Sequence, residues 1–170
     1  MSSKNEIAKL LICKDLISES LIIPEYQRPY TWKKKQLYQL LDDLKESIDS
    51  KQESYLLGTL IVYQNKENNN SAIELIDGQQ RITTISLVLK FLGFTKLGLN
   101  NQKYNHSESN KNLTQNYLLL KDWFEKKEID KEIFCDFILT KVFFVLINAP
   151  SLDEAFVFFD SQNGRGKSLE

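Results

Sequence analysis

A glycine between a strand pattern and a long apolar helix pattern constrains this chain most strongly. Residues 72–77 are rich in β-forming residues, Gly78 allows a tight turn, and residues 79–92 carry apolar groups on most sides, as a central helix does. The first three helical positions are nevertheless large and polar: Gln79, Gln80 and Arg81. A cation at a helix N-terminus opposes the helix dipole unless an anion lies between them. The sequence therefore predicts a strand, a turn and a buried helix that starts at a phosphate-binding site.

The composition is globular and excludes several classes of protein. With 170 residues, the chain is long enough for one domain with a core, and its net charge of −1 argues against a dedicated electrostatic DNA binder. Met1–Glu6 is polar and no apolar run reaches membrane-spanning length, so we expect a cytoplasmic protein with no membrane partner. Cys13 and Cys135 fall in helical patterns, which indicates packing thiols in a reducing compartment. The single histidine, His106, argues against histidine catalysis.

The remaining patterns predict an α+β domain with a few strands and about six helices. A capping box at Ser3-x-x-Glu6 predicts a short first helix that ends near Lys14. Residues 55–64 pair with 72–77 as a hairpin, and residues 141–148 form a buried strand. Residues 93–112, which hold glycine, asparagine, serine and lysine, are expected to form an internal polar loop. Further helices are expected around residues 37–48, 113–124, 133–138 and from Ser151 to near Asn163-Gly164.

Three polar clusters lie at the ends of apolar elements. The first, residues 24–32 (PEYQRPYTW), holds Gln27 and Arg28 between aromatic anchors, and the second is Asp77–Arg81. The third, residues 163–167 (NGRGK), has the composition of a flexible cationic turn. Each cluster also has a purely structural interpretation. In the first cluster, the aromatic residues would only hold a loop against the core. In the second, Asp77 would cap the helix and Arg81 would pair with an acidic residue. The third would be a glycine that ends a helix.

In the functional interpretation, the second cluster binds phosphate. Gly78 lets the backbone approach the ligand, and Arg81 grips a phosphate with two hydrogen bonds. Asp77 holds a divalent cation, orients a water or bonds a ribose hydroxyl. The chain contains neither GxxxxGK[ST] nor GxGxxG, so any nucleotide cradle is of another type.

Together and in this order, the clusters resemble the N-terminal domain of GmrSD-type restriction enzymes. That family shows an IPxYQRPYxW segment, an LG-containing strand, IDGQQRxTT and a late FxxxNxRGxxL segment. The matching residues here are 23–32, Leu57-Gly58, 76–84 and 159–169, so the resemblance spans nearly the whole chain. It implies a ParB/sulfiredoxin-like fold, a small mixed sheet surrounded by helices, as one domain over residues 1–170.

The resemblance also implies binding and hydrolysis of a nucleoside triphosphate of unknown base, with Mg²⁺, in defence against phage DNA that carries modified bases or a modified backbone. DNA and a C-terminal nuclease domain or partner subunit are then the expected partners, and a homodimer stays open. We also expect the chain to be the N-terminal piece of a longer protein, because its last turn leads into a further element. The implied catalytic residues are Asp77, Gln80 and Arg81, with Asp77 also the metal ligand. The implied nucleotide-binding residues are Gln27, Arg28, Gly78, Gln79, Gln80, Arg81, Thr83, Asn163, Arg165 and Lys167.

Two other functions remain as alternatives. One is a ParB-like nuclease domain that nicks DNA by itself, although the sequence offers no dense carboxylate or histidine cluster for it. The other is a non-catalytic module that binds DNA or a partner protein but no nucleotide.

Overall fold

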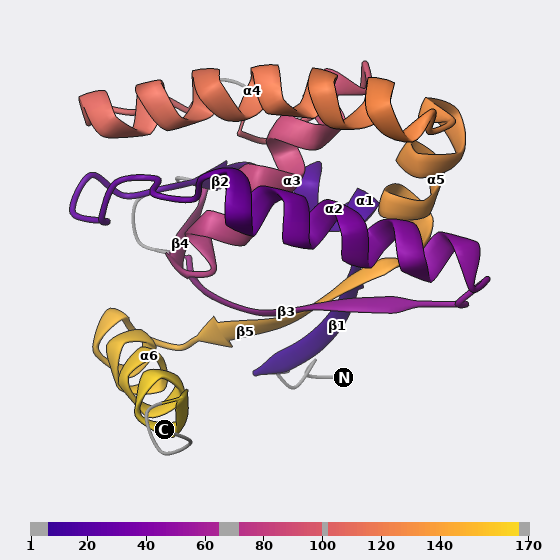
Figure 1. Ribbon diagram of the computed structural model, residues 1–170. Coiled ribbons are helices and arrows are strands. Elements are labelled where there is room, and N and C mark those ends of the chain that lie inside the picture. The colour runs from indigo at the N-terminus through magenta and orange to yellow at the C-terminus, as the bar shows by residue number, and fades with distance from the viewer. Residues whose placement is uncertain (1–6, 65–71, 100–101, 167–170) are drawn as a thin grey trace.

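A five-stranded mixed sheet organises the computed structural model, which describes residues 7–64, 72–99 and 102–166 (Figure 1). The strand order is β1-β5-β3-β4-β2, in which β1–β5 and β3–β4 are antiparallel pairs and β5–β3 and β4–β2 are parallel pairs. The strands are β1 (Ala8–Ile12), β2 (Leu21–Ile22), β3 (Tyr55–Tyr63), β4 (Ile73–Asp77) and β5 (Val142–Ala149). The predicted α+β class is therefore confirmed.

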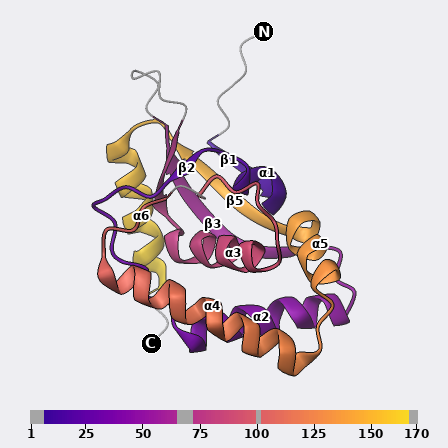
Figure 2. The ribbon, with the colours of Figure 1, turned by 90° about the horizontal axis from the view of Figure 1, so that it is seen from above.

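The helices cover the two faces of this sheet unequally. Helices α2, α3, α4 and α5 lie above the sheet in Figure 1, whereas α6 lies below it, near the end of β5. Viewed from above, α3 lies over the middle of the sheet and α4 runs beside α2 (Figure 2). The helices are α1 (Cys13–Ile17), α2 (Lys34–Asp49), α3 (Gln79–Phe91), α4 (Ser107–Lys127), α5 (Lys131–Lys141) and α6 (Leu152–Gly166). In the described part of the chain, none of them has the length and apolar character needed to cross a bilayer.

The main core holds α3 in place. Its side chains Ile82, Ile85 and Val88 are fully buried, and they join one cluster with Leu37 and Leu41 of α2. Burying such a side chain stabilises the fold by about 1.5–3 kcal/mol. Because α3 is buried on most sides, as its pattern predicts, the position of its first turn is fixed by the core rather than by local contacts.

A second, smaller core lies under α6. It consists of Ile61, Ile76, Ala149 and Ala155, and Phe159 packs against it partly buried. Only Ala155 among the described side chains of α6 is fully buried. Helix α6 is therefore joined to the ends of β3, β4 and β5 by a small apolar contact.

The predicted first helix is wrong. Residues 8–12 form strand β1 at the edge of the sheet, where Ala8 pairs with Ile147 and Ile12 pairs with Phe143. The capping box at Ser3 and Glu6 lies outside the described residues. Local helix signals are weak, so the hydrogen bonds offered by the neighbouring strand decide the conformation.

The predicted loop over residues 93–112 is also wrong in its second part, because α4 begins at Ser107. Its first turns carry the buried polar residues Ser109 and Asn112, which bind the backbone of Tyr30. A helix whose polar residues are buried by such tertiary hydrogen bonds has the same polar composition as a loop. Composition alone therefore could not reveal this helix. The first part of the segment is held inward, since the Gly98 N–H donates to the Ile17 carbonyl at 2.6 Å.

Both cysteines are free thiols, and Cys13 is buried. Burial, together with the nearby Cys135, raises the pKa of the Cys13 thiol to about 12. A thiol that stays protonated at neutral pH is a weak nucleophile, which agrees with the predicted packing role.

Candidate functional site

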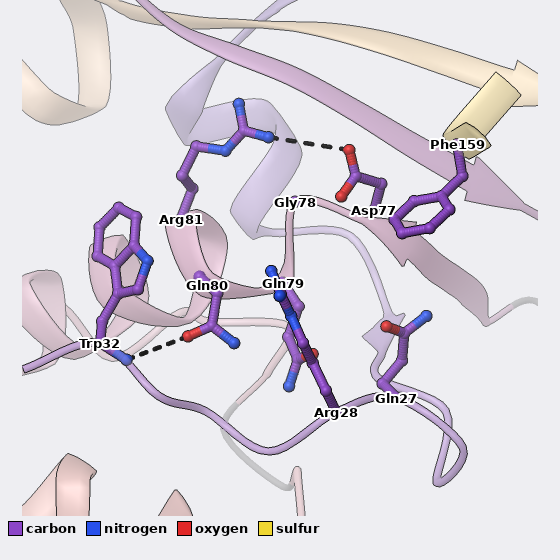
Figure 3. A pocket seen from close by; sticks show the side chains of 9 residues that line it. All are labelled: Gln27, Arg28, Trp32, Asp77, Gly78, Gln79, Gln80, Arg81 and Phe159. Atoms are coloured by element: carbon purple, nitrogen blue, oxygen red, sulfur yellow. Dashed lines mark hydrogen bonds and ion pairs between the residues drawn. The ribbon is translucent and has the colours of Figure 1, made fainter. Parts of the chain in front are cut away.

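A cavity of about 330 Å³ opens where β4 ends and α3 begins (Figure 3). Three separate segments form its walls: the loop of residues 24–32, the β4–α3 turn and helix α6. Its lining residues are Gln27, Arg28, Trp32, Asp77, Gly78, Gln79, Gln80, Arg81 and Phe159. The first two predicted clusters are therefore brought together, and we call this space the phosphate-side cavity after the phosphate site that the sequence predicts here.

Gly78 shapes the floor of the phosphate-side cavity. It is the N-cap of α3 in the left-handed conformation, with φ of 94° and ψ of 10°. A Cβ built on it would overlap Leu60 Cδ2 of the strand beneath, so the position requires glycine. Within the described ranges, no side-chain hydrogen bond caps the helix, and an uncapped N-terminus is the arrangement that favours an anion.

Gln80 joins the first cluster to the second. Its Oε1 accepts hydrogen bonds from the Thr31 N–H at 2.9 Å and the Trp32 N–H at 3.2 Å, and its Nε2 donates to the Pro29 carbonyl at 3.1 Å. The side chain is buried. These bonds use Oε1 and one of the two N–H donors of the amide, and they give Gln80 a positioning role in the loop. The catalytic role that we predicted for Gln80 stays a prediction.

Replacing Gln80 with leucine is expected to lower the free energy of unfolding by about 2–3 kcal/mol, because loop N–H groups lose their acceptor. Urea unfolding followed by circular dichroism measures this difference. Gln39→Leu is the matched control, since Gln39 is exposed and should cost no more than about 0.5 kcal/mol. Equal effects of the two substitutions would contradict the positioning role.

Gln27 fixes the other end of the same loop. Its Nε2 donates to the Ile76 carbonyl at 3.0 Å and lies 3.4 Å from the Leu75 carbonyl. Arg28, the next residue, is exposed and lines the cavity. In Figure 3 its side chain extends from the loop toward the start of α3. Gln27 therefore holds the backbone from which Arg28 reaches the cavity.

Arg81 and Asp77 face each other across the cavity. Their Nη2 and Oδ2 atoms are 3.9 Å apart, and both side chains are less than one-third exposed. An ion pair at this distance contributes about 0–1 kcal/mol to the stability of the fold. Because this contribution is small, an anionic ligand can compete with Asp77 for the guanidinium. Among the nine lining residues, Asp77 is the single carboxylate.

Gly58 of β3 makes room for Arg81, and the role of this glycine was not predicted. Its φ is 142°, and a Cβ built on it would overlap Arg81 Nη1. The signal was present in the sequence as the glycine of the Leu57-Gly58 motif, but nothing in the local pattern connects it with Arg81. The guanidinium thus lies directly over the backbone of β3.

Gln79 is 6% exposed, and its Oε1 has no hydrogen-bond partner among the described residues. A buried acceptor without a donor costs about 1–3 kcal/mol, so Gln79 carries an energetic cost at the first turn of α3. Thr83, predicted at the same site, lies one turn further along α3 and lines a separate cavity with Tyr104.

The cavity also has aromatic walls. Trp32 and Phe159 lie on opposite sides of it in Figure 3. Helix α6 supplies Phe159, and its Phe156 ring lies 6.2 Å from the Tyr26 ring of the loop. Phe159 belongs to the late family segment, but we did not predict it as a site residue.

The third cluster does not form the predicted glycine turn, because α6 continues through Gly164 to Gly166. The helix can continue because it is supported by the second core at its start. Asn163 and Arg165 lie in the last part of this helix, and Lys167 lies outside the described residues. Their contacts with a nucleotide remain a prediction.

The side chains of the phosphate-side cavity fit an Mg²⁺ site to which substrate phosphates also supply oxygen ligands. In the described ranges, no group of three or more His, Cys, Asp or Glu side chains converges on a metal position. Mg²⁺ is commonly held by one or two carboxylates together with substrate phosphates. Asp77 would supply such a carboxylate, and the ion would neutralise phosphate charge.

Comparison with known proteins identifies the family of the chain. The family described as the N-terminal domain of the GmrSD restriction endonuclease matches residues 9–170. The chain therefore belongs to the GmrSD restriction endonuclease N-terminal domain family, as the motifs predict. A search of the curated proteins found no match.

Proposed function

We propose that this domain binds a nucleoside triphosphate in the phosphate-side cavity and hydrolyses it, as the regulatory part of a restriction system that acts against modified phage DNA. The observation that supports this best is the convergence of two guanidinium groups and an uncapped helix N-terminus on one cavity. Arg28 and Arg81 come from different segments, and both line the cavity. Its volume of about 330 Å³ lies within the range of small-molecule sites.

The side chains have separate roles in this proposal. Arg81 and the N–H groups after Gly78 bind the phosphates, because both offer donors to a dispersed negative charge. Arg28 adds a second positive charge from the exposed rim of the cavity. Asp77 orients the attacking water or holds Mg²⁺, and Gln27 and Gln80 keep the loop in place by the bonds described above.

Isothermal titration calorimetry with each of the four common ribonucleoside triphosphates, in the presence of Mg²⁺, tests the proposal. We expect binding with at least one of them, together with phosphate release in a colorimetric assay. A folded sample that binds none of the four would overturn it.

The two alternative functions predict different results. A nuclease domain would nick plasmid DNA in a metal-dependent reaction that Asp77→Ala abolishes. A pure interaction module would bind modified DNA but not nucleotide. The single carboxylate of the cavity gives no support to the nuclease alternative, so we rank it below nucleotide binding.

A further inference from the structure

A second cavity of about 290 Å³ adjoins the phosphate-side cavity, and the two share Trp32 and Arg81 as lining residues. The second cavity lies between helix α2 and strand β3, and we call it the α2–β3 cavity. Its further lining residues include Gln39 and Asp43 of α2 and Tyr55 and Leu57 of β3. None of these four residues was predicted as part of a site.

The two cavities differ in chemistry. The phosphate-side cavity has two arginines and the uncapped start of α3. The α2–β3 cavity shares Arg81 and is also lined by Lys35, but it adds apolar and aromatic walls and a carboxylate. The walls come from Trp32, Tyr55 and Leu57, and the carboxylate comes from Asp43. One side therefore suits a charged phosphate chain, and the other suits a flat ring with hydrogen-bond donors.

Arg81 occupies the junction of the two cavities because Gly58 has no side chain. The guanidinium lies against the β3 backbone at Gly58, next to Leu57. A side chain at position 58 would push Arg81 away from the strand and change the wall that both cavities share.

Asp43 has acceptor capacity that the described residues do not fill. Its Oδ1 accepts a hydrogen bond from Gln39 Nε2 at 2.8 Å, and the side chain is half-buried. Asp43 and Tyr55 line the same cavity, where burial raises the pKa of the Tyr55 hydroxyl and the negative charge of Asp43 raises it further. An ionised carboxylate can accept about four hydrogen bonds.

We infer that the α2–β3 cavity binds the nucleoside half of the triphosphate. The base stacks on Trp32, as bases stack on aromatic side chains elsewhere. Asp43 accepts a hydrogen bond from a donor on the nucleoside, which is either a ribose hydroxyl or an N–H of the base. This inference rests on the proposed function, since it assumes that the phosphates lie beside Arg81.

Inorganic tripolyphosphate and the tightest-binding ribonucleoside triphosphate are the probes that separate the two cavities. Both contain the phosphate chain, and only the nucleotide contains the nucleoside. We expect calorimetry with Mg²⁺ to show that the nucleotide binds at least about tenfold more tightly than tripolyphosphate.

Asp43→Asn is the decisive variant, because asparagine retains an acceptor for Gln39 and should fold. It should weaken nucleotide binding about tenfold, as the loss of a charged hydrogen bond does, and leave tripolyphosphate binding unchanged. Asp49→Asn makes the same change on the same helix, at an exposed carboxylate that pairs with Lys45, and should change neither affinity.

Comparing the ribonucleotide with its 2′-deoxynucleotide shows which group of the nucleoside donates the hydrogen bond to Asp43. If the 2′-deoxynucleotide binds the wild type as weakly as the ribonucleotide binds Asp43→Asn, the donor is the ribose 2′-hydroxyl. If the deoxynucleotide binds normally, the donor is another nucleoside group. Unchanged nucleotide binding by Asp43→Asn, or equal weakening of both probes, would overturn the inference while leaving the proposed function in place. Failure of both probes to bind the wild type would overturn the proposed function itself.

Discussion

Replacing Gly78 with alanine is expected to lower the free energy of unfolding by about 2–5 kcal/mol. The left-handed backbone at φ of 94° costs an L-residue about 1–2 kcal/mol. The new Cβ would also overlap Leu60 Cδ2 and approach the Thr59 carbonyl oxygen to 3.4 Å, and such overpacking costs about 1–3 kcal/mol. Because Leu60 is fully buried in the main core, neither the strand nor the turn can move away cheaply.

Gly93→Ala is the matched control for this prediction. Gly93 also has a positive φ, of 89°, but a Cβ built on it meets no atom within 4 Å. It should therefore cost only the backbone strain of about 1–2 kcal/mol. Urea unfolding of both variants, followed by circular dichroism, gives the comparison. If both alanine variants lower the free energy of unfolding by the same amount, the packing of the Gly78 turn on β3 contributes nothing to stability. That result would contradict the role we give to Gly78 in fixing the cavity floor.

The strand–turn–helix around Gly78 could be predicted because every local signal agrees there. The strand ends at Asp77, the glycine allows the left-handed turn, and residues 79–91 are apolar on most sides. The clustering of Gln27 and Arg28 with Arg81 was predicted from motif order together with the family resemblance. Local signals and tertiary packing favour the same conformation in this region.

The structural roles of Gln80 and Gly58 could not be predicted from the sequence. Gln80 binds backbone groups that are 48 to 51 residues away, and Gly58 meets Arg81 only because β3 lies beneath α3. Strand β1 is a similar case, since its partner β5 lies more than 130 residues later in the chain. Contacts of this kind depend on the assembled sheet, which no local pattern encodes.

Other implications of the resemblance stay predictions. These are the ParB/sulfiredoxin-like topology, the Mg²⁺ requirement, contact with DNA and a C-terminal nuclease partner, while a homodimer stays open.

Arg81→Gln is expected to weaken binding of the nucleoside triphosphate by about 100-fold, as the loss of two charge-assisted hydrogen bonds would. The stability of the domain should change by less than about 1 kcal/mol, because the ion pair with Asp77 spans 3.9 Å and is partly exposed. Calorimetry with Mg²⁺ measures the affinity, and urea unfolding measures the stability.

Lys121→Gln controls for the loss of one positive charge from an i,i+4 ion pair. Lys121 lies 4.0 Å from Glu125 on the exposed face of α4, far along the chain from the cavity residues. Its replacement should leave both affinity and stability unchanged. If Arg81→Gln instead destabilises the domain by several kcal/mol and binds nucleotide normally, Arg81 is a structural residue packed on Gly58. A large loss of affinity with unchanged stability is the result expected if the guanidinium contacts the ligand, since its ion pair with Asp77 adds at most about 1 kcal/mol to the stability of the fold.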